Sequence, residues 1–152
     1  SNDPEFTYKP IYCEETMLFV SPQHRFAKRS SVTLEEALTE PLITYPKNTQ
    51  YRQLIDVTLT QLNLNYRPKY ESNNLGLIKH FIQMNMGVHF SGPSYMQNEI
   101  KKNELVQVEI EHNPFPIAHL YIVYRDGELN SLDRLFIRHF EQELSSYSSI
   151  PL

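Results

Sequence analysis

Apolar residues recur at helical spacing in three stretches of the chain. Residues 51–62 carry them at the i, i+3, i+4, i+7, i+8 and i+11 positions, which predicts an amphipathic helix. Residues 74–86 are apolar around more than half of a helical circumference, so we expect that helix to be largely buried. Residues 132–144 form a third such stretch, and Asn130 is its expected N-cap.

Short apolar runs between these helices predict strands. Residues 11–21 end in the run Met-Leu-Phe-Val, which is typical of a central strand covered on both faces. We expect further strands at residues 42–45, 88–90 and 117–124, and an edge strand at residues 105–110, where apolar and polar side chains alternate. Strands that alternate with helices indicate an α/β domain with a largely parallel sheet.

Capping residues and helix breakers set the expected boundaries. Thr33 and Glu36 fit a capping box for a short helix at residues 34–39. Gly87 follows the helix at residues 74–86, and we expect it to turn the chain with a positive φ. Residues 93–102 predict one more brief helix. The prolines of residues 112–116 predict a rigid connector, and a hinge, between two strands.

Composition limits the possible classes of protein. The chain has 152 residues, of which 40% are hydrophobic, and this is enough for one compact domain. The net charge of −4 and the scattered basic residues argue against a nucleic-acid surface. No apolar run approaches the roughly 20 residues of a membrane span, and the first residues do not resemble a signal peptide. We therefore expect a cytoplasmic protein.

The sequence shows no pattern of catalytic or metal-binding residues. Cys13 lies in a predicted strand with no glycine turn or second acid nearby, which argues against a nucleophile. His112 and His119 are seven residues apart across prolines and match no zinc spacing. We expect neither catalysis nor a cofactor nor a metal.

Two predicted turns favour an anion site. Residues 44–49 and 72–74 each follow a strand end and precede a helix, so in a parallel sheet both turns lie at one edge. The free amides of a helix N-terminus attract small anions, and Lys47 is a possible counter-charge. The expected ligand is a small carboxylate or a similar anion.

Three stretches, in this order, resemble the effector-binding domain of LysR-type transcriptional regulators over residues 11–144. They are LFVSPQHRFAKRSSVTLEEALTEPLI, ESNNLGLIKHFIQMNMGVHFSGPS and LYIVYRDGELNSLDRLFIRHFEQEL. Asn85 departs from the family pattern, which commonly has glycine there, and Arg25 replaces a common proline.

The resemblance implies a periplasmic-binding-protein-like, two-lobed Rossmann-type domain with a small-molecule cleft between the lobes. Residues 25–113 correspond to a complete second lobe, and residues 11–24 and 114–144 to part of a first lobe. Residues 1–10 are then a disordered start or a leftover of cloning, and residues 145–152 a tail. In the family, such a domain senses a metabolite and acts on DNA through a separate winged helix-turn-helix that this chain lacks. Because most of the first lobe is missing, the strands at residues 17–20 and 120–124 lose their cover. We therefore expect the chain to self-associate as a homodimer or tetramer, or to associate tightly with the missing segment.

The resemblance also places the effector contacts. They fall on the turn after the predicted strand at residues 42–45, at the cap of the helix at residues 74–86, and beyond Gly87. The residues are Thr44, Pro46, Lys47, Asn48, Thr49, Ser72, Asn73, His89 and Ser91. Several of them also have a purely structural interpretation. Thr49, Asn48 and Ser72 are helix-capping types, and a lone histidine such as His89 is more often a core residue than a ligand group.

One alternative function remains open on the sequence alone. A solute-binding or enzyme domain of the same two-lobed architecture would show a similar order of strands and helices. It would need a secretion signal or a catalytic constellation, and neither is visible in this chain.

Overall fold

The computed structural model describes residues 5–125 and 127–145, without the side chains of the last two. The chain divides into two compact units. Unit 1 combines residues 1–15 with residues 117–152, and unit 2 is Thr16–Pro116. The expected tail falls outside the described residues, apart from Ser145.

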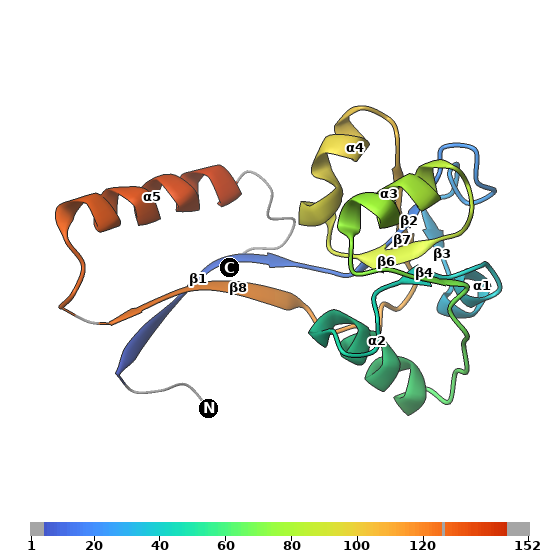
Figure 1. The fold of residues 1–152 in the computed structure, drawn as a ribbon, viewed down its shortest axis with the longest axis horizontal. Coiled ribbons are helices and arrows are strands. Elements are labelled where there is room, and N and C mark those ends of the chain that lie inside the picture. Colours follow the sequence, from blue (N-terminus) through green and yellow to red (C-terminus); the bar gives the residue numbers. More distant parts are fainter. Residues whose placement is uncertain (1–4, 126, 146–152) are drawn as a thin grey trace. The chain divides into compact units, whose positions relative to one another are not determined.

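Unit 2 is built on a mixed sheet (Figure 1). Four strands are hydrogen-bonded in the order β3-β7-β2-β6. A further pair, β4-β5, is parallel, and a parallel bridge from Leu42 to Val88 links it to the chain just before β6. The strands are β2 (Met17–Val20), β3 (Ser31–Val32), β4 (Ile43–Thr44), β5 (Tyr70–Glu71), β6 (His89–Ser91) and β7 (Val106–Ile110).

Strand β2 is central, as its apolar run predicts, but it runs antiparallel to both β6 and β7. The expectation of an edge strand at residues 105–110 is wrong, because β7 lies between β2 and β3. The outer partner β3 is only two residues long and lies in a polar stretch, so its sequence carries no strand pattern.

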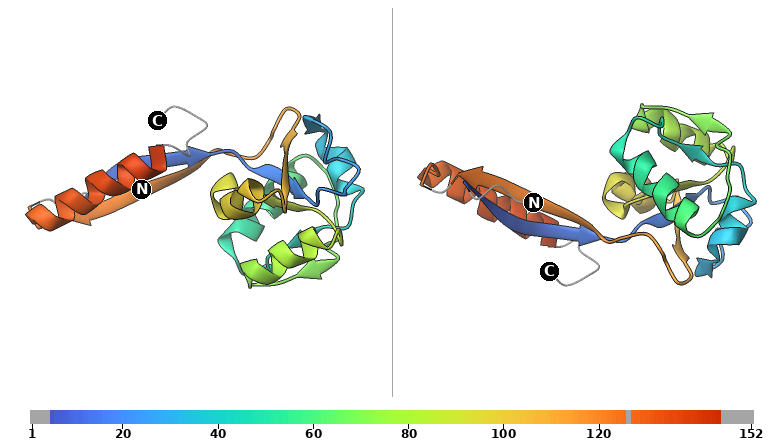
Figure 2. Two further views of the ribbon diagram at one scale, coloured as in Figure 1. Left: turned by 90° about the horizontal axis from the view of Figure 1, so that it is seen from above. Right: turned by 90° about the horizontal axis from the view of Figure 1, so that it is seen from below.

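Helices cover both faces of this sheet (Figure 2). On one face, α1 (Leu34–Leu38) and α2 (Gln50–Gln61) pack on the side chains of Leu18, Val88 and Val108. On the other, α3 (Leu75–Gln83) and the 3-10 turn η1 (Pro93–Met96), which α4 (Gln97–Lys101) continues, pack on Met17 and Phe19. Alternate side chains of β2 therefore enter two different cores.

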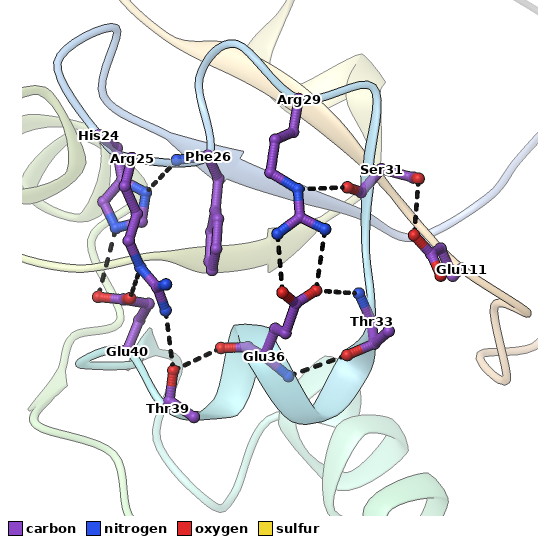
Figure 3. Close-up of polar contacts among 10 residues, drawn as sticks. All are labelled: His24, Arg25, Phe26, Arg29, Ser31, Thr33, Glu36, Thr39, Glu40 and Glu111. Atoms are coloured by element: carbon purple, nitrogen blue, oxygen red, sulfur yellow. Dashed lines mark hydrogen bonds and ion pairs between the residues drawn. The ribbon is translucent and has the colours of Figure 1, made fainter.

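The capping box of α1 is present, and it belongs to a larger polar cluster (Figure 3). Arg29 donates two hydrogen bonds to Glu36, at 2.7 and 3.0 Å. Those bonds, together with the bond from the Thr33 amide, lower the pKa of the Glu36 carboxyl to about 2. The guanidinium groups of Arg25 and Arg29 both lie over the ring of the buried Phe26, which anchors this loop in the core.

The helix α3 is less buried than its composition predicts. Ile78 and Ile82 are fully buried, but Leu77 is 43% exposed and Met84 59% exposed. The positive φ that we expected at Gly87 occurs at Asn85, with a φ of 56°. Gly87 is required for a different reason, because a Cβ there would lie 2.2 Å from the Pro41 carbonyl oxygen.

Unit 1 consists of a two-stranded ribbon and a helix. Strand β1 (Phe6–Glu14) pairs antiparallel with β8 (Ala118–Arg125), with an irregularity between Pro10 and Tyr12. The helix α5 (Ser131–Ser145) begins after Asn130, whose side chain accepts from the Leu132 and Asp133 amides as predicted.

Four expectations about unit 1 are wrong. Residues 11–21 are not one strand, because the chain leaves β1 at Glu14 and β2 then pairs within unit 2. For the same reason the boundary between units falls after residue 15 and not after residue 24. Residues 6–10, within the expected disordered start, belong to β1 because each pairs with a residue of β8. The second boundary falls after Pro116, at the end of the proline connector, and not after residue 113 as expected.

Apolar side chains of unit 1 remain exposed on α5 and β8. Leu132 is 72% exposed and Phe136 63% exposed, although they share the apolar stripe of the helix. We name the full set the unit 1 apolar surface: Ile117, Leu120, Tyr121, Val123, Leu132, Leu135, Phe136 and Phe140.

Candidate functional site

Two helix N-termini meet at one edge of the unit 2 sheet. Strands β4 and β5 are parallel neighbours, and each leads through a short turn into a helix. The Ser72 amide donates to the Thr44 carbonyl at 3.0 Å, which holds the two turns together. Thr49 caps α2 and Asn74 caps α3, each through its side-chain oxygen. The two turns therefore lie at one edge of the sheet, as the sequence predicts.

A pocket of about 300 Å³ opens beside these turns. Its lining combines three aromatic rings with small polar groups: Tyr45, Thr49, Tyr51, Asn73, Ser91 and Tyr95. The rings of Tyr45 and Tyr51 meet edge to face, 5.9 Å apart. Apolar walls with a few polar groups are typical of small-molecule sites, and the tyrosine rings offer a flat surface to a ligand.

A buried arginine lies behind the pocket. Arg52 is 2% exposed, and its Nη1 donates to the Tyr45 carbonyl and to Glu71 Oε1, both at 2.9 Å. Its Nε donates to Asp56 at 2.8 Å and to the Tyr66 hydroxyl at 2.7 Å. Burial raises the pKa of the Tyr66 hydroxyl, and so does its own hydrogen bond to Asp56. The hydrogen bonds of Nε and Nη1 offset the cost of burying the charged group.

His89 is buried behind Tyr45. It is 1% exposed, its ring lies 5.4 Å from the Tyr45 ring, and its Nδ1 is 2.8 Å from the Ile43 carbonyl. Because a carbonyl only accepts, Nδ1 carries the proton, and Nε2 has no hydrogen-bond partner among the described residues. Burial lowers the pKa of His89 to about 4. The imidazole is therefore neutral at pH 7.

The structure brings three of the nine predicted site residues to the pocket wall, namely Thr49, Asn73 and Ser91. Thr44 and His89 are buried and do not line the pocket. Pro46, Lys47, Asn48 and Ser72 belong to the two turns but are not part of the lining. Ser72 instead accepts a hydrogen bond from the amide of Asn74. Because Asn74 is the residue that caps α3, the interpretation of Ser72 as the helix cap is wrong.

The three tyrosines of the lining are not among the residues predicted from the sequence. Tyr45 ends the predicted strand at residues 42–45, and Tyr51 fits the apolar face of the next helix, so both match structural patterns. Tyr95 follows Pro93 in η1. Tyr45 lies one residue after β4 and Tyr95 four residues after β6, so the end of a strand marks these two positions, whereas Tyr51 lies in the first turn of α2.

Among residues 5–125 and 127–145, no cluster of three or more His, Cys, Asp or Glu side chains is placed to hold a metal ion. Within the same residues, no helix has the length and hydropathy needed to cross a membrane.

The family model described as LysR substrate binding domain matches residues 1–145. The chain belongs to this family. Its members are domains of transcriptional regulators, and the fold of the chain is the periplasmic-binding-protein-like α/β fold that the resemblance implies.

Known LysR-family proteins agree with this assignment. The regulatory domain of CcmR from Synechocystis PCC6803, solved in complex with 2-PG, is 19% identical, with a TM-score of 0.73 over 100% of this chain and 73% of that chain. The effector-binding domain of QuiR, solved with shikimate, is 14% identical, with a TM-score of 0.70 over 97% of this chain and 69% of that one. The regulator HinK from Pseudomonas aeruginosa is 14% identical, with a TM-score of 0.74 over 97% of this chain and 51% of that chain.

A curated relative extends the comparison to whole regulators. A probable RuBisCO transcriptional regulator from Cyanidioschyzon merolae is 26% identical over 111 residues, which are 71% of this chain. This LysR substrate-binding domain spans 37% of the length of that relative.

Proposed function

We propose that the chain is the sensory domain of a LysR-type DNA-binding regulator, and that it binds a small anionic metabolite in the pocket beside Tyr45. The observation that carries this proposal is the position of the pocket, next to the N-termini of both α2 and α3. The signal then passes to a separate winged helix-turn-helix, which contacts DNA in the cytoplasm.

The helix ends account for the preference for an anion. Each contributes about 0.3 to 1 kcal/mol to the binding of a negative charge, and hydrogen bonds from amides to a charged group contribute roughly 1.5 to 3 kcal/mol each. Among the described residues, no charged side chain lines the pocket, so amides, hydroxyls and the Asn73 side chain carry the recognition. Two structural neighbours were solved in complex with shikimate and with 2-PG, which supports a small polar effector.

The remaining predicted residues have supporting roles in this proposal. Lys47 and Asn48 are exposed on the turn before α2, where a mobile ligand group can reach them. Thr44, Pro46 and Ser72 shape the two turns through backbone contacts. His89 supports the ring of Tyr45 from behind.

Asn73→Phe is expected to block effector binding without unfolding the domain. Asn73 is exposed at the pocket wall, so a phenylalanine there fills the pocket and displaces no core residue. Calorimetric titration with a panel of small carboxylates that includes shikimate measures the effect. We expect at least a tenfold loss of affinity, about 1.4 kcal/mol.

The matched control is Asn65→Phe, an exposed asparagine in the loop after α2 that is not part of the pocket lining. It should bind like the wild type. Equal affinities of the wild type and Asn73→Phe would show that the ligand binds elsewhere.

We further expect the chain to self-associate as a homodimer or tetramer. Exposed apolar patches mark interaction sites, and Leu132, Leu135, Phe136 and Phe140 are exposed at helical spacing on α5. The ribbon of β1 and β8 also has no further strand paired with it among the described residues. Sedimentation velocity should show a concentration-dependent shift above the 17.9 kDa monomer. Phe136→Glu should reduce it, whereas Val57→Glu, at an exposed apolar position of α2, should not. A monomer at all concentrations would contradict this expectation.

A further inference from the structure

The network around Arg52 joins three segments of unit 2 at one guanidinium group. The arginine itself lies in the first turn of α2. Its Nε donates to Asp56, one turn further along the same helix, and to Tyr66 in the segment between α2 and β5. Its Nη1 reaches the carboxyl ends of two parallel strands, at the Tyr45 carbonyl after β4 and at Glu71 in β5. No part of Arg52 lines the pocket.

The two acceptors stand at the base of the two turns that form the pocket. Tyr45 is itself a lining residue and precedes the turn that ends at Thr49. Glu71 is two residues before Asn73, the lining residue of the second turn. Arg52 therefore connects the two walls of the pocket through one planar, rigid group.

The sheet alone holds these turns weakly. The ladder between β4 and β5 contains only two residue pairs, Ile43 with Tyr70 and Thr44 with Glu71. Beyond it, the Ser72 amide makes one more bond to the Thr44 carbonyl. A short ladder opens easily at its end, so a further link between Tyr45 and Glu71 has a large share in their spacing.

We propose that Arg52 is a positioning residue of the effector pocket, which sets the spacing between the Tyr45 wall and the Asn73 wall without touching the ligand. Its effect on a ligand rests on the proposed function, but its effect on the two turns does not. The role requires the fork of an arginine, because a lysine ammonium is a single point charge that lacks the planar set of donors.

Hydrogen exchange tests the effect on the turns in the absence of any ligand. Two amides report on them, Thr49, which donates to Pro46, and Ser72, which donates to Thr44. The Ile43 amide, bonded to the Val88 carbonyl, reports on the sheet of the same unit. We expect Arg52→Lys to raise the hydrogen-exchange rates of the Thr49 and Ser72 amides about tenfold more than that of the Ile43 amide. Local opening of the two turns then no longer has to break the contacts of the guanidinium group.

The matched control is Arg29→Met, which removes an arginine that is paired with Glu36 away from the pocket. It should leave exchange at Thr49 and Ser72 unchanged. Arg52→Met removes the charge as well and should exceed Arg52→Lys. Glu71→Gln, which leaves Arg52 intact, should affect Ser72 more than Thr49. Equal increases at Thr49, Ser72 and Ile43 in Arg52→Lys would overturn the proposal, because Arg52 would then stabilise unit 2 as a whole.

Binding of shikimate, the ligand named for one structural neighbour, provides the second measurement. We expect Arg52→Lys to weaken binding about tenfold, while Arg29→Met binds normally. At metal sites, the loss of a residue that only orients a binding group has an effect of this size. Wild-type affinity in Arg52→Lys would count against the positioning role. If the wild type binds neither shikimate nor any other carboxylate tested, the proposed function fails, and the exchange result alone decides the role of Arg52.

Discussion

Gly87→Ala is expected to lower the free energy of unfolding of unit 2 by about 3 kcal/mol, the upper end of the usual cost of overpacking. The new Cβ would lie 2.2 Å from the carbonyl oxygen of Pro41 and 3.1 Å from its carbonyl carbon. Both are backbone atoms, and the same oxygen accepts the hydrogen bond of the Val88 amide at 2.9 Å. The clash can therefore be relieved only if Pro41, just before β4, moves away from Gly87 and Val88, just before β6.

Urea denaturation of the wild type and the variant measures this cost. Gly76→Ala is the control, because its Cβ meets only the side-chain oxygen of Asn74, at 3.2 Å, and that side chain can shift. We expect the control to change the stability by less than about 1 kcal/mol, since alanine also favours the helix. A Gly87→Ala protein as stable as the control would mean that β4 and β6 approach less closely than the structure shows.

Acidification should destabilise unit 2 through His89. Its folded pKa of about 4 lies below the ordinary value of 6.5, so between these two pH values the unfolded chain binds a proton that the folded protein excludes. The stability contributed by the neutral imidazole is complete above pH 6.5 and is lost as the pH falls toward 4. A shift of this size corresponds to about 3 kcal/mol.

Denaturation curves at pH 7 and pH 4.5 of the wild type and His89→Gln isolate this contribution from that of the carboxylates. A glutamine amide can still donate to the Ile43 carbonyl, so we expect the variant to fold and to lose less stability on acidification. His80→Gln, which removes an exposed imidazole from α3, is the matched control. If both variants lose as much stability as the wild type, the burial of His89 does not drive the pH dependence.

Local patterns predicted the features that depend on neighbouring residues. The capping box at Thr33, the N-cap at Asn130 and the helix after Thr49 all follow from short-range spacing, and the structure confirms them. The order of strands and helices was also sufficient to indicate the fold. The resemblance to LysR regulators depended on that order over most of the chain.

Features that depend on distant partners were not predictable in the same way. The need for glycine at position 87 comes from Pro41, which is far away in the sequence, whereas the positive φ that glycine suggests is at Asn85. In the sequence, β1 and β2 look like one continuous apolar strand. In the structure, the chain passes from unit 1 to unit 2 between them, after Glu15. The pocket tyrosines resemble core residues in the sequence, because exposure to a cavity leaves no periodic pattern.

The antiparallel direction of β2 also has a consequence for the order in which the protein folds. This strand is the first part of unit 2 to be synthesised, and it lies at the centre of the sheet, yet both of its neighbours, β6 and β7, come from the last third of the unit. During synthesis, the run of Met17, Leu18, Phe19 and Val20 has no strand to pair with until most of unit 2 has left the ribosome. Long-range pairing of this kind slows folding and leaves an apolar strand available to other chains. A chaperone that binds short apolar segments would therefore find its main target in the nascent unit 2 at β2.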